Sequence, residues 1–169
     1  KHAAAQHRAK QKMDQIEAEF QAAFGRSYGG QVEEYRTEDA DIVFVTMGSQ
    51  TGAIREVVDS RREKGEKVGL VKLKLFRPFP RERLAAALRG KKAVGVIDRN
   101  VCFGWQSGTV FMEIKAALQD LPERIPVTGF IAGIGGMDCG IDMVERAVSI
   151  TQLAAAGKPH QEVTWLNLE

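Results

Sequence analysis

The segment DIVFVTMGSQTG, residues 41–52, decides how this chain folds. Its apolar run at 42–47 is rich in β-forming residues and predicts a short strand. A glycine-flanked turn at 48–52 follows, and the spacing of Ile54, Val57 and Val58 predicts a helix over 53–64. A strand that leads through a tight turn into a helix is the first part of a βαβ unit, which predicts a parallel sheet.

The same pattern of strand, turn and helix repeats to the end of the chain. Further strands are predicted at 68–76, 93–97, 127–132 and 163–168, with helices at 82–88, before Leu118 and at 141–155. We therefore expect an α/β fold of three layers, built on an open, mainly parallel sheet of five strands. Lys72 and Lys74 alternate with apolar residues, so one face of their strand should meet water or a partner.

An extra helix is predicted at the N-terminus, over residues 1–24. Its apolar residues recur at helical spacing and form one stripe: Met13, Ile16, Phe20 and Phe24. This stripe is a candidate docking surface, as is the strand face that carries Lys72 and Lys74. Gly25 is expected to end this helix. We divide the chain into a helix and linker, residues 1–36, and an α/β domain, residues 37–169. Because the chain starts at Lys1 and not at Met, we expect it to be either a fragment of a longer protein or a processed subunit.

The composition excludes several classes of protein. The 169 residues carry a net charge of only +2, which argues against nucleic-acid binding. No stretch is apolar for long enough to predict a membrane span. The two cysteines, Cys102 and Cys139, do not form a CxxC pair, and with no signal peptide they favour a cytoplasmic location. Metal-ligand spacing and cysteine clusters for iron–sulfur binding are missing.

Three glycine-rich loops, at 48–52, 98–108 and 133–140, follow predicted strands. The carboxyl ends of parallel strands meet at one edge of a sheet, so these loops should form one surface. The alternative is that they are tight turns into helices. We predict no catalytic residue and no metal ligand here, and we assign no cofactor-binding residue. The candidates for an interface are Gly48, Ser49, Gln50, Thr51, Asp98, Arg99, Asn100, Gly135, Gly136 and Asp138.

Several residues of these loops have a second interpretation. The amides of the 48–52 loop can bind an anion, or Ser49 or Thr51 caps the following helix. Asp98 and Arg99 form part of a site, or a local ion pair with helix-capping duty. Arg99 can lower the pKa of the Cys102 thiol, or Cys102 is a small, buried or half-buried cysteine without a reactive role. The second interpretation is favoured because no histidine lies near Cys102 in sequence to act as its base.

Several motifs, in this order, resemble one known family. They are FGRSY at 24–28, FVTMGS at 44–49, LFRPFP at 75–80, DRN at 98–100 and AGIGGMD at 132–138. Together they are similar to the C-terminal domain of the α subunit of pyruvate and other 2-oxoacid:ferredoxin oxidoreductases, the pyruvate synthase family. Met137 stands where the family often has Arg, and Cys102 and Trp105 vary the preceding loop. These departures leave open whether the substrate is pyruvate, another aliphatic oxoacid or an aromatic one such as phenylglyoxylate.

The resemblance implies a fold like the C-terminal domain of transketolase. It also implies a complex that oxidatively decarboxylates a 2-oxoacid to an acyl-CoA, using thiamine diphosphate, Mg, iron–sulfur clusters and coenzyme A. The expected partners are thiamine-binding and iron–sulfur subunits, and ferredoxin through the complex. The reactive centre is expected on other domains, and this domain is expected to bind no cofactor. The alternative is a regulatory module that binds an anion or a coenzyme.

Overall fold

Strand β2 (Ile42–Thr46) lies inside the sheet, and all of its residues are buried. Val43 and Val45 belong to the core on one face of the sheet, whereas Phe44 belongs to the core on the other. Successive side chains of a strand point to opposite faces, so a strand with helices on both sides needs apolar residues at every position. This explains the unbroken apolar run in the sequence.

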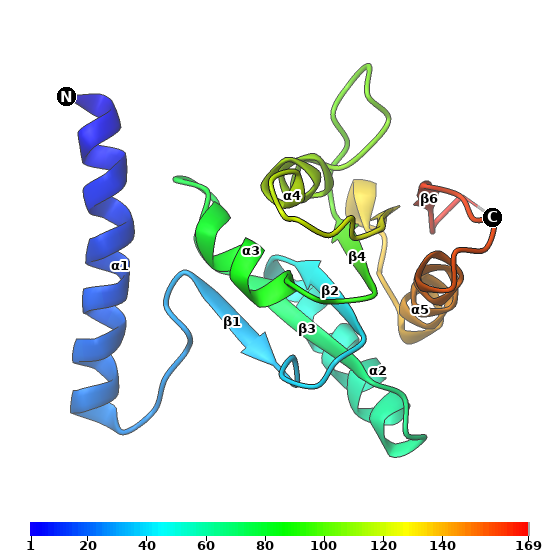
Figure 1. Cartoon of the computed structure of the whole chain (residues 1–169), viewed down its shortest axis with the longest axis horizontal. Coiled ribbons are helices and arrows are strands. Elements are labelled where there is room, and N and C mark those ends of the chain that lie inside the picture. Colours follow the sequence, from blue (N-terminus) through cyan, green and yellow to red (C-terminus); the bar gives the residue numbers. More distant parts are fainter. Residues whose placement is uncertain (169) are drawn as a thin grey trace.

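The computed structural model describes residues 1–168 and contains a sheet of six strands (Figure 1). Their order is β1-β3-β2-β4-β5-β6. Every pair is parallel except β1 with β3, which is antiparallel. The other strands are β1 (Val32–Tyr35), β3 (Val68–Leu73), β4 (Ala93–Asp98), β5 (Val127–Ile131) and β6 (Val163–Trp165).

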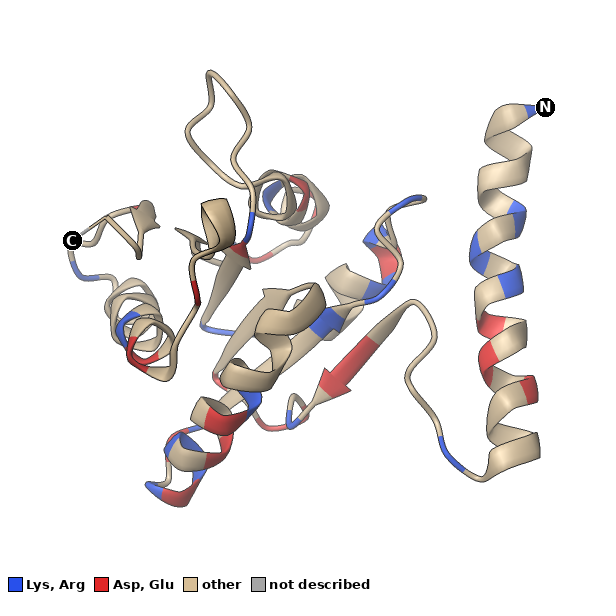
Figure 2. Ribbon diagram, turned by 180° about the vertical axis from the view of Figure 1, so that it is seen from behind, with Lys and Arg blue, Asp and Glu red and all other residues tan. Residues whose placement is uncertain are grey.

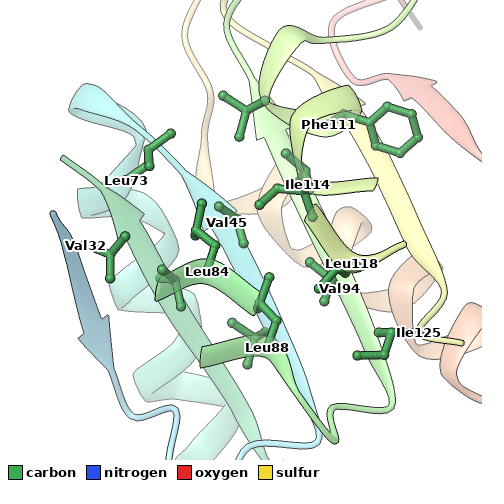
Figure 3. Packing of buried hydrophobic residues seen from close by; sticks show 14 of the residues in the cluster. Val32, Val45, Leu73, Leu84, Leu88, Val94, Phe111, Ile114, Leu118 and Ile125 are labelled. Atoms are coloured by element: carbon green, nitrogen blue, oxygen red, sulfur yellow. The ribbon is translucent and has the colours of Figure 1, made fainter. Parts of the chain in front are cut away.

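Two pairs of helices cover the two faces of this sheet. On one face lie α2 (Thr51–Glu63) and α5 (Ile141–Ala155), and on the other lie α3 (Arg81–Leu88) and α4 (Thr109–Leu118). Short 3-10 helices, η1 (Gly48–Gln50) and η2 (Ile134–Gly136), follow β2 and β5. Figure 3 shows the core on the α3 and α4 face, where Leu84 of α3 and Ile114 of α4 are packed. The predicted three-layer α/β fold is confirmed.

The sequence-based count of five strands was wrong because it omitted β1. This strand has the sequence VEEY, in which two carboxylates interrupt the apolar pattern. It pairs with β3 at the edge of the sheet, where Glu33 faces Lys72. An edge strand tolerates such charges because one side of it is open. The predicted boundary between residues 36 and 37 stays a prediction, although β1 lies before it in the chain.

Helix α1 (His2–Phe24) stands beside the sheet (Figure 1), and none of its residues is buried. It is tied to the body by polar contacts, among them Lys10 with Glu82 at 2.9 Å and Gln31 with Asp14 at 2.6 Å. As predicted, the helix ends at Gly25, which is left-handed with φ of 67°. No helix among residues 1–168 is long and apolar enough to cross a membrane.

Candidate functional site

The strand order places a topological switch next to β2. The chain passes from β2 to β3 on one side, and then to β4 on the other side. The crossovers on the two sides of such a point run in opposite directions, and the loops that follow the strands leave a crevice between them. Here those loops are 47–50, after β2, and 99–108, after β4. The third predicted loop follows β5, which pairs with β4.

Asp98, the last residue of β4, is buried, with an exposed fraction of 2%. Its carboxylate accepts the N–H of Val110 at 3.0 Å and the N–H of Phe111 at 2.9 Å. It also accepts the Asn100 side-chain amide at 3.3 Å. Burial raises the pKa of this carboxyl above its ordinary value, although the three N–H donors oppose that shift. Asp98 therefore caps the first turn of α4, and residues 1–168 contain no ion pair between it and Arg99.

Asn100 fixes the base of the loop that follows. Its side-chain oxygen accepts the backbone N–H of Thr109 at 3.0 Å and the Thr109 hydroxyl at 2.9 Å. Beyond it, the N–H of Cys102 donates to the carbonyl of Ser107 at 2.9 Å, and these two residues form an antiparallel bridge. The loop is thus a tight hairpin fastened to the start of α4. We call residues 102–107 the aromatic hairpin.

The aromatic hairpin presents two large side chains to solvent. Phe103 is 96% exposed and Trp105 is 75% exposed. The sequence contains no charged residue between Arg99 and Glu113, and Figure 2 shows the protruding loop free of Lys, Arg, Asp and Glu. Sequence reasoning did not select Phe103 or Trp105 as site residues. The detectable signal was an aromatic pair around a glycine within this uncharged stretch.

Arg99 connects the three loops. Its Nε donates to the carbonyl of Gly133 at 2.8 Å, and its Nη1 lies 3.5 Å from the Ser49 hydroxyl. Gln50 is buried, and its side-chain amide donates to the carbonyl of Ala132 at 3.1 Å. The structure therefore brings together Ser49, Gln50 and Arg99, three of the residues selected from the sequence.

The remaining candidates have mainly structural contacts. The Thr51 hydroxyl donates to the carbonyl of Gly48 at 2.7 Å, which closes the turn before α2. Neither Ser49 nor Thr51 makes the predicted side-chain cap of that helix, which starts after Gln50 without one. Gly135 and Gly136 have positive φ and lie exposed in η2. Asp138 is also exposed, and its carbonyl accepts the side-chain amide of Asn167 at 3.0 Å.

Two cavities meet at these loops. The first, of about 470 Å³, is lined by Met47, Gly48, Ser49, Gln50, Leu73, Lys74, Phe76, Arg99 and Asn100. The second, of about 440 Å³, is lined by Ser49, Gln50, Ala53, Arg99, Gly133, Met137, Asp138, Cys139 and Gly140. Ser49, Gln50 and Arg99 belong to both.

Burial raises the pKa of the Cys139 thiol, and Asp142 adds to that shift. Within residues 1–168, no three His, Cys, Asp or Glu side chains are grouped to hold a metal ion.

Comparison with known families gives one match to a large part of the chain. Residues 40–144 match the family described as pyruvate:ferredoxin oxidoreductase core domain II. This range includes β2 to β5, the crevice and the aromatic hairpin.

Curated relatives align with almost the whole chain. The α subunit of NADH-dependent phenylglyoxylate dehydrogenase from Aromatoleum evansii is 42% identical over 92% of this chain. Subunit PorA of pyruvate synthase from Pyrococcus furiosus is 39% identical over 97% of it. Subunit VorA of ketoisovalerate oxidoreductase from Pyrococcus horikoshii is 38% identical over 99% of it. The alignments cover 37%, 41% and 42% of these proteins, so the chain spans about two fifths of their length.

Solved structures with the same fold include the 2-oxoglutarate:ferredoxin oxidoreductase of Magnetococcus marinus, solved with 2-oxoglutarate, coenzyme A and succinyl-CoA bound. It superposes with a TM-score of 0.54 at 25% identity, over 72% of this chain and 20% of that one. A split-gene transketolase has a TM-score of 0.54 at 19% identity, over 73% of this chain and 41% of that one. The second likeness concerns the fold alone.

Proposed function

Because the chain belongs to the family of pyruvate:ferredoxin oxidoreductase core domain II, we propose that it is an interface domain of a 2-oxoacid:ferredoxin oxidoreductase. Its relatives carry the names of enzymes of phenylglyoxylate, pyruvate and ketoisovalerate, which are all 2-oxoacids. The proposed complex decarboxylates such an acid, transfers the acyl group to coenzyme A and passes two electrons to ferredoxin. The three names differ in the oxoacid, so the proposal extends to the class of substrate only.

The proposed complex uses thiamine diphosphate with Mg, iron–sulfur clusters and coenzyme A. We place these groups on other domains or subunits, which are the proposed partners of this chain. The coenzyme A and succinyl-CoA bound in the 2-oxoglutarate enzyme support the acyl-transfer step. Both Cys102 and Cys139 are free cysteines, in agreement with a proposed cytoplasmic location.

The aromatic hairpin is the observation that carries the interface role. A soluble surface rarely exposes a Phe and a Trp side by side at the exposures found for Phe103 and Trp105. The hydrogen bonds at its base hold the loop in one conformation, so little conformational entropy is lost on docking. Burial of each large side chain contributes about 1.5 to 3 kcal/mol, and Trp is a frequent hot spot of interfaces.

A second docking surface is proposed on residues 1–36, outside the proposed α/β domain of residues 37–169. Ile16 is 50% exposed and Phe24 is 64% exposed on α1. The Phe20 ring lies 4.6 Å from the Phe24 ring and 5.6 Å from the Tyr28 ring, between ring centroids. The rings of Phe20, Phe24 and Tyr28 form an aromatic cluster, and Phe24 and Tyr28 in it are exposed.

The test is co-purification from the native source with this chain as bait. We expect recovery of thiamine-binding and iron–sulfur subunits, together with dye reduction that depends on a 2-oxoacid. The double variant Phe103→Ser, Trp105→Ser should fold normally and lose both. The control is Leu153→Ser, which changes an exposed apolar residue, 38% exposed, on α5.

The outcomes separate the parts of this proposal. Recovery of the chain alone by the unmodified bait would refute membership of such a complex. Recovery that is equally strong with the double variant would refute the role of the aromatic hairpin. Turnover of a 2-oxoacid by the purified 169 residues alone would refute the placement of the reactive centre elsewhere.

A further inference from the structure

The larger of the two cavities described above, at the carboxyl ends of the parallel strands, has the position and the size of a ligand site. It opens between the loops after β2 and β4, at the point where the strand order reverses. Ligands of open α/β sheets bind in this crevice. Its volume of about 470 Å³ lies within the range of about 300 to 1,000 Å³ that is usual for small-molecule pockets.

The charges around this cavity are of one sign. Lys74 and Arg99 are its ionisable lining residues, and no carboxylate lines it. The Asp98 carboxylate does not line the cavity and accepts hydrogen bonds from the backbone amides of α4. The ammonium of Lys74 donates to the carbonyl of Tyr28 at 2.6 Å and lies 3.9 Å from Glu17, so its charge is partly balanced.

Arg99 is the cation with unused capacity. A guanidinium has five N–H donors, and Arg99 gives one to the Gly133 carbonyl and directs another toward Ser49 at 3.5 Å. Residues 1–168 offer it no carboxylate partner within ion-pair distance. The bond to Gly133 holds the guanidinium in place before any ligand arrives, which lowers the entropic cost of binding.

Part of the lining of this cavity is apolar. Its apolar side chains are Met47, which follows β2, and Leu73 and Phe76, at and beyond the end of β3. The neighbouring cavity, which Arg99 also lines, contains the exposed Asp138. An anion therefore meets less electrostatic repulsion in the first cavity, and an apolar group attached to it has surface to cover.

We propose that this crevice binds a small organic anion, with its phosphate or carboxylate on Arg99 and Ser49 and its apolar part against Met47 and Phe76. The site is separate from the aromatic hairpin, and the proposal does not depend on the docking role. Guanidinium groups bind phosphate and carboxylate alike, through paired N–H donors. The two kinds of anion are therefore distinguished by experiment.

The experiment is a titration of the ¹⁵N-labelled 169-residue chain, followed by NMR. The probes are phenyl phosphate, phenylacetate and the neutral phenylacetamide, each at millimolar concentrations. We expect at least one anion to shift the amide signals of Gly48, Ser49 and Asn100, and the neutral amide to leave them unchanged. Arg99→Gln should weaken that binding by about tenfold or more, and Arg99→Lys by less.

The matched control is Arg124→Gln, which removes the same charge from a different cavity and should leave binding unchanged. Binding of phenyl phosphate alone would identify a phosphate ligand, and binding of phenylacetate alone a carboxylate ligand. The proposal is overturned if neither anion shifts these signals, or if Arg99→Gln and Arg124→Gln weaken binding equally. The shifts in the unmodified chain decide the location of the site even if Arg99→Gln does not fold.

Discussion

Replacement of Asp98 by Asn tests whether this residue is a structural cap. Asp98 accepts two backbone N–H groups of α4, one on each carboxylate oxygen. Asn has one acceptor oxygen, and its NH₂ group would face the second N–H. A buried N–H without an acceptor costs about 1 to 3 kcal/mol. Removal of a buried charge offsets part of this cost, so we expect a net loss of about 1 to 2 kcal/mol at neutral pH.

This loss is measurable by urea unfolding. The midpoint should fall while the slope m stays constant, because the surface exposed on unfolding does not change. The melting temperature should fall by about 2 to 4 °C for each kcal/mol in a domain of this size. The control is Asp120→Asn, since the Asp120 side chain is 78% exposed in its pair with Arg81 and should matter by less than about 0.5 kcal/mol.

The pH dependence of the Asp98→Asn effect has a definite sign. Burial raises the folded-state pKa of Asp98 above 3.8, so folding favours its protonated form. Its contribution to the free energy of unfolding is complete below pH 3.8 and decreases as the pH rises through the folded-state pKa. The difference in free energy of unfolding between the wild type and Asp98→Asn should therefore become smaller as the pH rises. Equal stability of the two proteins at acid and neutral pH would refute the assigned role.

Three further variants test other parts of the fold. Leu84→Ala should lower the free energy of unfolding by about 2 to 5 kcal/mol, because Leu84 is a fully buried side chain of α3; urea unfolding checks it. Phe20→Ser with Phe24→Ser should cost less than about 1 kcal/mol, since α1 has no buried residue; a larger loss in the same assay would contradict the exposed position of α1. Hydrogen bonds from Ser27 and Tyr28 lower the pKa of Glu17 from 4.5 to about 2, so its stabilising contribution is present above pH 4.5 and lost as the pH falls toward 2. Glu17→Gln should therefore increase the rate of amide hydrogen exchange at Tyr28 at neutral pH. Below about pH 2 the exchange rates of the variant and the wild type should become equal, and hydrogen-exchange NMR measures both.

The fold was predictable because both faces of the sheet are covered. Every position of β2 and β4 is buried, so the strands appear as apolar runs between turn residues. Strand β1 was missed for the opposite reason. Glu33 and Glu34 lie at the edge of the sheet, where Glu33 pairs with Arg55 at 2.5 Å, and no local pattern reports such a distant partner.

The candidate site was predictable in position but not in its contacts. The loops after β2, β4 and β5 were selected because parallel strands end at one edge. The reach of Arg99 to Gly133 joins residues 34 positions apart, which only the tertiary structure determines. The exposure of Phe103 was also hidden, because an aromatic residue in a loop is usually expected to be covered by its own chain.

The base and the tip of the aromatic hairpin have separate tasks, and this separation bears on how such proteins diverge. Asp98, Asn100 and Thr109 fasten α4 to β4 through bonds that do not involve Phe103 or Trp105. Selection can therefore change the residues at the tip, and with them the choice of partner, at little cost to folding. Loops of this kind allow one scaffold to enter many assemblies while its core is preserved.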